Sequence, residues 1–82
     1  MSDYAEEREI VEDVWEEYVN AIEKFEIFPT THHGFAVIKE EVDELWEEVK
    51  KKEQKAPERK RRMKLEAVQI AAMAIRFIKD LC

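Results

Sequence analysis

The sequence predicts an all-α protein made of three amphipathic helices joined by two short breaks. Charged residues make up 41% of the 82 residues and hydrophobic residues 45%, whereas the chain has one glycine and two prolines. This composition leaves little for turns, so disorder, a collagen-like chain and a β-sandwich all fit poorly. The two prolines, Pro29 and Pro57, mark the breaks. The length suits one core, so residues 1–82 are predicted to form a single helical domain.

The first helix is expected over residues 3–26. Apolar residues recur there at spacings of three, four and seven, and acidic residues fill most of the other positions. In the following break, Pro29 disfavours helix at Phe28, and Thr30 or Thr31 can cap the next helix. The predicted apolar stripe consists of Tyr4, Val11, Val14, Trp15, Tyr18, Ile22 and Phe25.

The second helix is expected over residues 32–54 and the third over residues 58–81. The break between them is Lys55-Ala56-Pro57, and proline is well suited to the start of a helix. The predicted core stripe of the second helix consists of Phe35, Ile38, Val42, Leu45, Trp46 and Val49.

The third helix is too apolar to be covered by its own chain. Between Ala67 and Ile78 only Gln69 and Arg76 are polar. A helix that is apolar all round is buried all round, and two other short helices cannot surround it. We therefore expect a homo-oligomer, a dimer or a tetramer, with this helix at the centre of a four-helix-type bundle. Because unpaired buried charge is costly, Glu66, Gln69 and Arg76 need partners or a function.

The charge is unevenly distributed along the chain. The net charge is −6, but residues 50–64 carry +7 and the remaining residues −13. A nucleic-acid-binding surface usually makes a whole domain basic, so nucleic acid is not the expected partner. The basic run is interpreted as a solvated connector, with attraction of a polyphosphate or a nucleic-acid contact as the alternatives.

Two features point to a cytoplasmic protein that does not enter a membrane. No apolar run approaches the roughly 18 residues of a membrane span. The only cysteine is Cys82 at the end of the chain, which excludes an internal disulfide and makes a reducing compartment the default.

The acidic motif Glu40-Glu41-x-x-Glu44 on the second helix is a candidate metal site. Like charges at these spacings repel, and a divalent cation relieves the repulsion. Hard carboxylate oxygens suit Mg²⁺ or Mn²⁺. Glu66 and Gln69 lie at i, i+3 on the third helix, and facing helices that carry such pairs build carboxylate metal sites in bundles. The alternatives are a solvated acidic face for the first three residues, pairing with nearby Arg or Lys residues for Glu66, and a buried hydrogen bond that fixes the helix register for Gln69.

These motifs resemble those of the MazG-like, all-α nucleoside-triphosphate pyrophosphohydrolases. The stretches HHGFAVIKEEVDELWEEV and EAVQIAAMAIRFIKDL are similar to short stand-alone members of that superfamily, over about residues 31–81. The family motif is EExxE followed by ExxD. The first half matches in full, whereas Gln69 stands where the family has aspartate.

The resemblance implies Mg²⁺-dependent hydrolysis of nucleoside or deoxynucleoside triphosphates to a monophosphate and pyrophosphate, in nucleotide-pool housekeeping. Carried over by position, Glu40, Glu41 and Glu44 are the catalytic and metal-binding residues, and Glu66 and Gln69 complete the metal site. An amide is a poorer Mg²⁺ ligand than a carboxylate. The alternative is therefore a catalytically degenerate oligomer that binds nucleotide or metal, or serves a structural role.

Two further residues are candidates for substrate binding. His33 precedes Glu40 by seven residues and so shares its side of the helix, and Arg76 can reach phosphate from the third helix. A solvent-facing or capping histidine is the alternative interpretation of His33.

Overall fold

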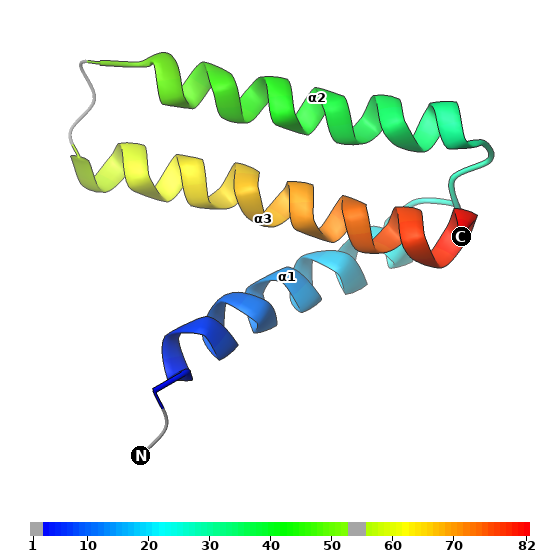
Figure 1. Ribbon diagram of the computed structural model, residues 1–82, viewed down its shortest axis with the longest axis horizontal. Helices are drawn as coiled ribbons and strands as arrows, with labels where there is room; N and C mark the ends of the chain where they lie inside the picture. The colour runs from blue at the N-terminus through cyan, green and yellow to red at the C-terminus, as the bar shows by residue number, and fades with distance from the viewer. Residues whose placement is uncertain (1–2, 53–55) are drawn as a thin grey trace.

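The computed structural model describes residues 3–52 and 56–82, apart from the side chain of Ala56, and consists of three α-helices (Figure 1). They are α1 (Ala5–Lys24), α2 (Thr31–Lys50) and α3 (Ala56–Leu81). The described residues contain no strand, so the predicted all-α class and the helix order are confirmed. Within those residues, none of the helices combines the length and hydropathy needed to span a bilayer.

Helices α2 and α3 form an antiparallel hairpin (Figure 1). The first turn of α2 lies against the last turns of α3 because Gly34 is buried there without a side chain. A Cβ atom at Gly34 would lie 2.8 Å from Cδ2 of Phe77 and 2.9 Å from Cδ1 of Leu81. At the other end, the Arg59 side chain donates one hydrogen bond to the Lys51 carbonyl and one to the Val49 carbonyl. These contacts fix the register of the hairpin.

Helix α3 is the central element, since it packs against both α2 and α1, which do not pack against each other. Helix α1 crosses beneath α3, and its N-terminal half projects away from the hairpin (Figure 1). The molecule is accordingly flat, with extents of 39 × 37 × 19 Å. Its buried hydrophobic residues lie where α1, the α1–α2 loop and α3 meet: Tyr18, Ala21, Phe28, Ala72 and Met73.

The loop between α1 and α2 is held against the end of α3. Phe28 is buried, and its backbone N–H donates a hydrogen bond to Oδ2 of Asp80 over 3.1 Å. Thr30 then caps α2, since its Oγ1 accepts a hydrogen bond from the His33 N–H over 3.0 Å. Thr30 or Thr31 was predicted to cap this helix, and the structure shows that Thr30 is the N-cap residue.

The predicted helix limits need correction. Helix α1 covers residues 5–24 instead of 3–26, because the backbone is extended at Phe25. Helix α2 ends at Lys50 and not at residue 54, because Lys51 is extended and Arg59 bonds to the carbonyls of Val49 and Lys51. The end of that prediction, residues 53–54, lies outside the described residues. Helix α3 begins at Ala56, two residues earlier than predicted.

The predicted apolar stripes are only partly buried within one chain. On α1, Tyr18 is buried and Val14 packs against the core, but Trp15 is exposed. On α2, Ile38 packs against the core, but Trp46 is exposed. Three helices have too little surface to cover every stripe, so much apolar surface stays exposed to solvent. The exposed residues of the two predicted stripes are Tyr4, Val11, Trp15, Ile22, Phe25, Phe35, Val42, Trp46 and Val49, and α3 adds Ile75 and Ile78.

Candidate active site

Three of the predicted site residues converge between α2 and α3. Glu41, Glu44 and Glu66 each place a carboxylate oxygen within 4.8 Å of the others. Glu41 and Glu44 are one turn apart on α2, and the antiparallel register brings Glu66 of α3 opposite them. Glu41 and Glu66 are half-buried, whereas Glu44 is exposed. The hairpin therefore builds a carboxylate cluster that opens to solvent on one side.

The electrostatics of this cluster favour protonation of Glu41. The pKa of Glu41 is raised to about 7, mainly by burial, and also by the charges of Glu44 and Glu66, a hydrogen bond with Glu44 and the charge of Glu40. Burial and the charges of Glu44 and Glu48 also raise the pKa of Glu66. The cluster thus binds a proton more readily than isolated glutamates do.

The donor set fits a hard divalent cation. Within the described part of the chain, Oε2 of Glu41 is buried and has no hydrogen-bond partner. A cation between Glu41, Glu44 and Glu66 would supply the missing partner and remove the repulsion that raises their pKa values. Oxygen-only ligands at a half-exposed site suit Mg²⁺ or Mn²⁺.

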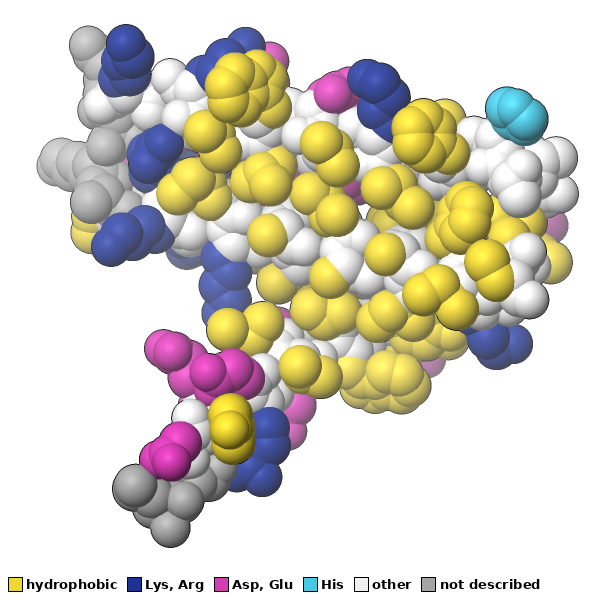
Figure 2. Space-filling view, viewed as in Figure 1, with side chains coloured by type: hydrophobic (Ala, Val, Ile, Leu, Met, Phe, Trp, Pro, Cys, Tyr) yellow, Lys and Arg dark blue, Asp and Glu magenta, His cyan; other side chains and the backbone are white. Residues whose placement is uncertain are grey.

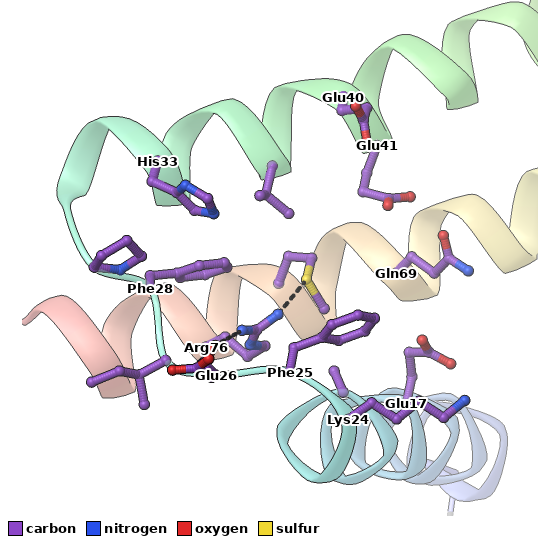
Figure 3. Close-up of a pocket in the computed structure, with 15 residues that line it drawn as sticks. Glu17, Lys24, Phe25, Glu26, Phe28, His33, Glu40, Glu41, Gln69 and Arg76 are labelled. Carbon is purple, nitrogen blue, oxygen red and sulfur yellow. Dashed lines mark hydrogen bonds between the residues drawn. The ribbon is translucent and has the colours of Figure 1, made fainter.

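Two other predicted metal ligands, Glu40 and Gln69, lie beside the cluster and line a pocket next to it (Figure 3). Glu40 is exposed, and it is outside the carboxylate cluster because one residue turns it about 100° from Glu41. Gln69 is half-buried on α3. Glu41 belongs to both the cluster and the pocket wall, and it therefore connects them.

The pocket has a volume of about 760 Å³, within the range of small-molecule sites. It lies between the end of α1, the α1–α2 loop, the first half of α2 and the second half of α3. Lys24, His33 and Arg76 contribute basic groups to its wall, and Phe25 and Phe28 contribute aromatic rings. The remaining lining residues are Glu17, Ala21, Glu26, Ile27, Pro29, Val37, Glu40, Glu41, Gln69 and Met73.

Arg76 is the buried cation of this pocket, with 4% of its surface exposed. Its guanidinium donates to the Glu26 carbonyl over 2.9 Å and to Sδ of Met73 over 3.5 Å (Figure 3). It also lies 4.2 Å from the centroid of the Phe28 ring. Among the described residues its Nε is buried without a partner. Arg76 thus combines a structural role with hydrogen-bonding capacity at the pocket wall.

His33 lies at the outer edge of the same pocket. Its side chain is exposed, and the imidazole centroid is 6.0 Å from that of Phe28. Its backbone N–H, and not its ring, takes part in the helix cap with Thr30. The structure therefore brings His33 and Arg76 to one pocket from two helices.

Several pocket residues were not singled out from the sequence as site residues. Glu17, Lys24 and Phe25 come from the end of α1, and Phe28 comes from the loop. The sequence did contain a signal for the aromatic pocket residues. Phe25 and Phe28 precede Pro29 in an apolar break, where a short loop must turn back onto the core. Asp80 was a second signal, because it is an acidic residue near the end of an apolar helix. Its carboxylate accepts the hydrogen bond from the Phe28 N–H that attaches the loop to α3.

No family model matches this chain, and no curated protein or solved structure is significantly similar to it.

Proposed function

We propose that this protein is a MazG-like, Mg²⁺-dependent pyrophosphohydrolase that converts nucleoside or deoxynucleoside triphosphates to monophosphates and pyrophosphate. The observation that carries the proposal is the convergence of Glu41, Glu44 and Glu66 beside a pocket that contains the buried Arg76. The motif resemblance of residues 31–81 supports the reaction class.

The carboxylate cluster supports a metal-dependent reaction. Glu41, Glu44 and Glu66 would hold Mg²⁺, with Glu40 and Gln69 at the edge of the site. The metal would neutralise phosphate charge and lower the pKa of a bound water. One of Glu40, Glu41 and Glu44 would orient the attacking water or accept its proton.

The pocket beside the cluster supports a nucleotide substrate. Its volume of about 760 Å³ accommodates a base and sugar, and the exposed Phe25 offers an aromatic face for stacking. Lys24 and Arg76 supply positive charge for phosphate oxygens, which the surrounding acidic residues would otherwise repel, and the His33 imidazole can donate a hydrogen bond to them. A triphosphate would thus extend from the aromatic end of the pocket to the carboxylate cluster.

A turnover assay tests this proposal. Purified protein is incubated with each common NTP and dNTP and Mg²⁺ or Mn²⁺, and the products are separated by ion exchange. We expect equal amounts of monophosphate and pyrophosphate, and no product when the metal is chelated.

Matched carboxylate variants locate the activity. Glu41→Gln and Glu44→Gln should lower kcat at least about 100-fold, since each removes a charged metal ligand. Asp43→Asn is the control, because Asp43 is on the same helix but is exposed and paired with Lys39 over 3.1 Å. Wild-type protein that gives no product with any nucleotide would contradict the enzymatic proposal.

Gln69 favours one alternative, a helical protein that binds nucleotide or metal without turnover. The amide occupies the pocket wall where the resembled family has a carboxylate. That protein would show a higher Tm with Mg²⁺ and nucleotide but no product. A thermal-shift assay run beside the turnover assay separates the two functions.

A further inference from the structure

The facing sides of α2 and α3 form a polar seam along the hairpin. Glu44 meets Glu66 in the carboxylate cluster, and farther along the Lys51 carbonyl accepts a hydrogen bond from Arg59. Both pairings belong to one antiparallel register, so each turn toward Lys51 on α2 is matched by a turn toward Arg59 on α3. Spacings of three and four residues place the following residues on the seam: Val37, Glu41, Glu44 and Glu48 of α2 with Lys51 at its C-terminal end, and Met73, Gln69, Glu66, Arg62 and Arg59 of α3.

The sign of the charge changes twice along this seam. The pocket end contains the buried Arg76, and the centre contains the carboxylates. The other end carries three basic residues, called the cationic end below: Lys51, Arg59 and Arg62. Glu48 is the acidic seam residue at this end, and its Oε2 accepts a hydrogen bond from Lys51 over 3.0 Å. Three cations against one carboxylate leave the cationic end positive.

The surface around the cationic end is basic as well. Figure 2 shows Lys and Arg side chains gathered at the end of the hairpin where α2 finishes and α3 begins. Three exposed basic residues belong to this surface: Lys52, Lys60 and Arg61. Lys50 and Lys64 lie there too, but they form ion pairs with acidic residues. Such an excess of positive charge attracts an anion that carries several charges.

The pocket and the cationic end lie on opposite sides of the carboxylate cluster. Glu41 and Gln69 line the pocket, whereas Glu48 and Arg62 follow in the other direction along the seam. With a nucleoside in the pocket and its α-phosphate at the cluster, the β- and γ-phosphates therefore extend toward the cationic end. Arg62 is half-buried there, about 5.4 Å or one turn along α3 from Glu66.

We propose that the cationic end binds the leaving pyrophosphate through Arg62 and Lys51. This inference rests on the proposed function, because it assigns the second product of that reaction to a site. A guanidinium has five N–H donors and an ammonium three, and both groups bind phosphate oxygens through charge-assisted hydrogen bonds. Arg59 is a positioning residue, since it holds the backbone of Lys51 through the carbonyls of Val49 and Lys51.

The site acts on the charge that the reaction moves. The water oxygen forms a bond to the α-phosphorus, and the bond from this phosphorus to the oxygen that bridges to the β-phosphorus breaks. The bridging oxygen leaves with the electron pair as part of pyrophosphate. One proton of the water passes to a glutamate of the α2 motif, and the other stays on the monophosphate. Donors at the cationic end stabilise the negative charge that the pyrophosphate gains.

The test is calorimetric titration of the protein with inorganic pyrophosphate in the presence of Mg²⁺. Arg62→Gln and Lys51→Gln should each weaken pyrophosphate binding at least about 10-fold and change the affinity for a nucleoside monophosphate less than about 2-fold. Arg61→Gln is the matched control, because Arg61 is exposed and turned about 100° from Arg62, and it should keep the wild-type affinity. Lys51 is exposed beyond the last turn of α2, so Lys51→Gln tests the site even if Arg62→Gln fails to fold.

Three results would overturn the assignment. They are a wild-type protein that does not bind pyrophosphate, an equal loss of affinity in Arg61→Gln and Arg62→Gln, and a single-stranded oligonucleotide that binds more tightly than pyrophosphate through the same residues.

The turnover assay keeps this inference apart from the proposed function. If the wild-type protein releases pyrophosphate but neither variant changes the affinity for it, the inference fails and the proposed function stands. If pyrophosphate binding depends on Arg62 and Lys51 but no nucleotide is converted, the site stands and the proposed function fails.

Discussion

The guanidinium of Arg76 lies 4.2 Å from the centre of the Phe28 ring, although 48 positions separate the two residues along the chain. Phe28 is itself held by Asp80, one turn after Arg76 on α3. One helix therefore fixes the α1–α2 loop through two polar side chains. Because the loop carries Glu26 and Phe28 at the pocket wall, this attachment also shapes the candidate active site.

Replacing Arg76 should loosen this attachment. Arg76→Met keeps a long side chain of similar helix propensity but loses the hydrogen bond to the Glu26 carbonyl and the contact with the Phe28 ring. We expect the free energy of unfolding to fall by about 2 kcal/mol. The measurement is a urea titration at fixed protein concentration. Lys79→Met, at an exposed position of the same helix, is the control, and equal midpoints for the two variants would contradict the role given to Arg76.

Asp80 should stabilise the fold through its hydrogen bond more than through its charge. Asp80→Ala leaves the N–H of the buried Phe28 without its acceptor, so we expect a loss of about 1–2 kcal/mol. Asp80→Asn keeps an acceptor oxygen and should lose less than half of that. Thermal unfolding of the two variants measures the difference. Equal losses would show that the charge, and not the acceptor, is what matters.

The raised pKa of Glu41 makes stability depend on pH. The pKa is about 7 in the folded protein and 4.5 without the effects of the fold, so the folded state binds more protons between these values. The free energy of unfolding should therefore fall as the pH rises through this interval, by about 1–2 kcal/mol when solvent screening is included, and level off above it. Urea titrations between pH 4.5 and pH 8 measure this slope.

A neutral side chain at position 41 should remove most of this dependence. Glu41→Gln cannot ionise, so its Tm at pH 8 should exceed that of the wild-type protein while its activity is lost. Glu47→Gln, on an exposed part of α2, serves as the control and should retain the wild-type slope. A slope that persists in Glu41→Gln would assign the titration to another group.

The sequence alone was enough to predict the three helices, a cap by Thr30 or Thr31, and a site between the second and third helices. The predicted site residues were Glu40, Glu41, Glu44, Glu66 and Gln69, and the structure brings the carboxylates of Glu41, Glu44 and Glu66 together. These follow from local spacing, together with the one assumption that adjacent helices run antiparallel. Glu40 shows the limit of this reasoning. Its neighbour Glu41 reaches the cluster, while Glu40 only lines the pocket, and the difference depends on how far α2 is rotated toward α3.

The contacts of the loop could not be predicted in the same way. The Phe28–Asp80 and Arg76–Glu26 hydrogen bonds join residues 52 and 50 positions apart, and no periodic pattern encodes such pairs. The ends of α1 and α2 were placed too far along the chain for a related reason. Long charged helices carry no strong stop signal, and tertiary contacts such as those of Arg59 decide where α2 ends.

Position 69 offers the most direct test of how the site uses its metal. Gln69→Asp adds a carboxylate at the pocket wall beside Glu41, where the resembled family has one. The concentration of Mg²⁺ that gives half-maximal turnover should fall about 3- to 10-fold, because another negative ligand faces the cation. Without metal the Tm of this variant should fall, since the added charge repels Glu41.

Gln69→Asn is the control, because asparagine has nearly the same shape as aspartate but no charge. This variant should keep the wild-type Mg²⁺ dependence. If both variants lose activity equally, the glutamine side chain itself is required, and the site depends on an amide that the resembled family does not have.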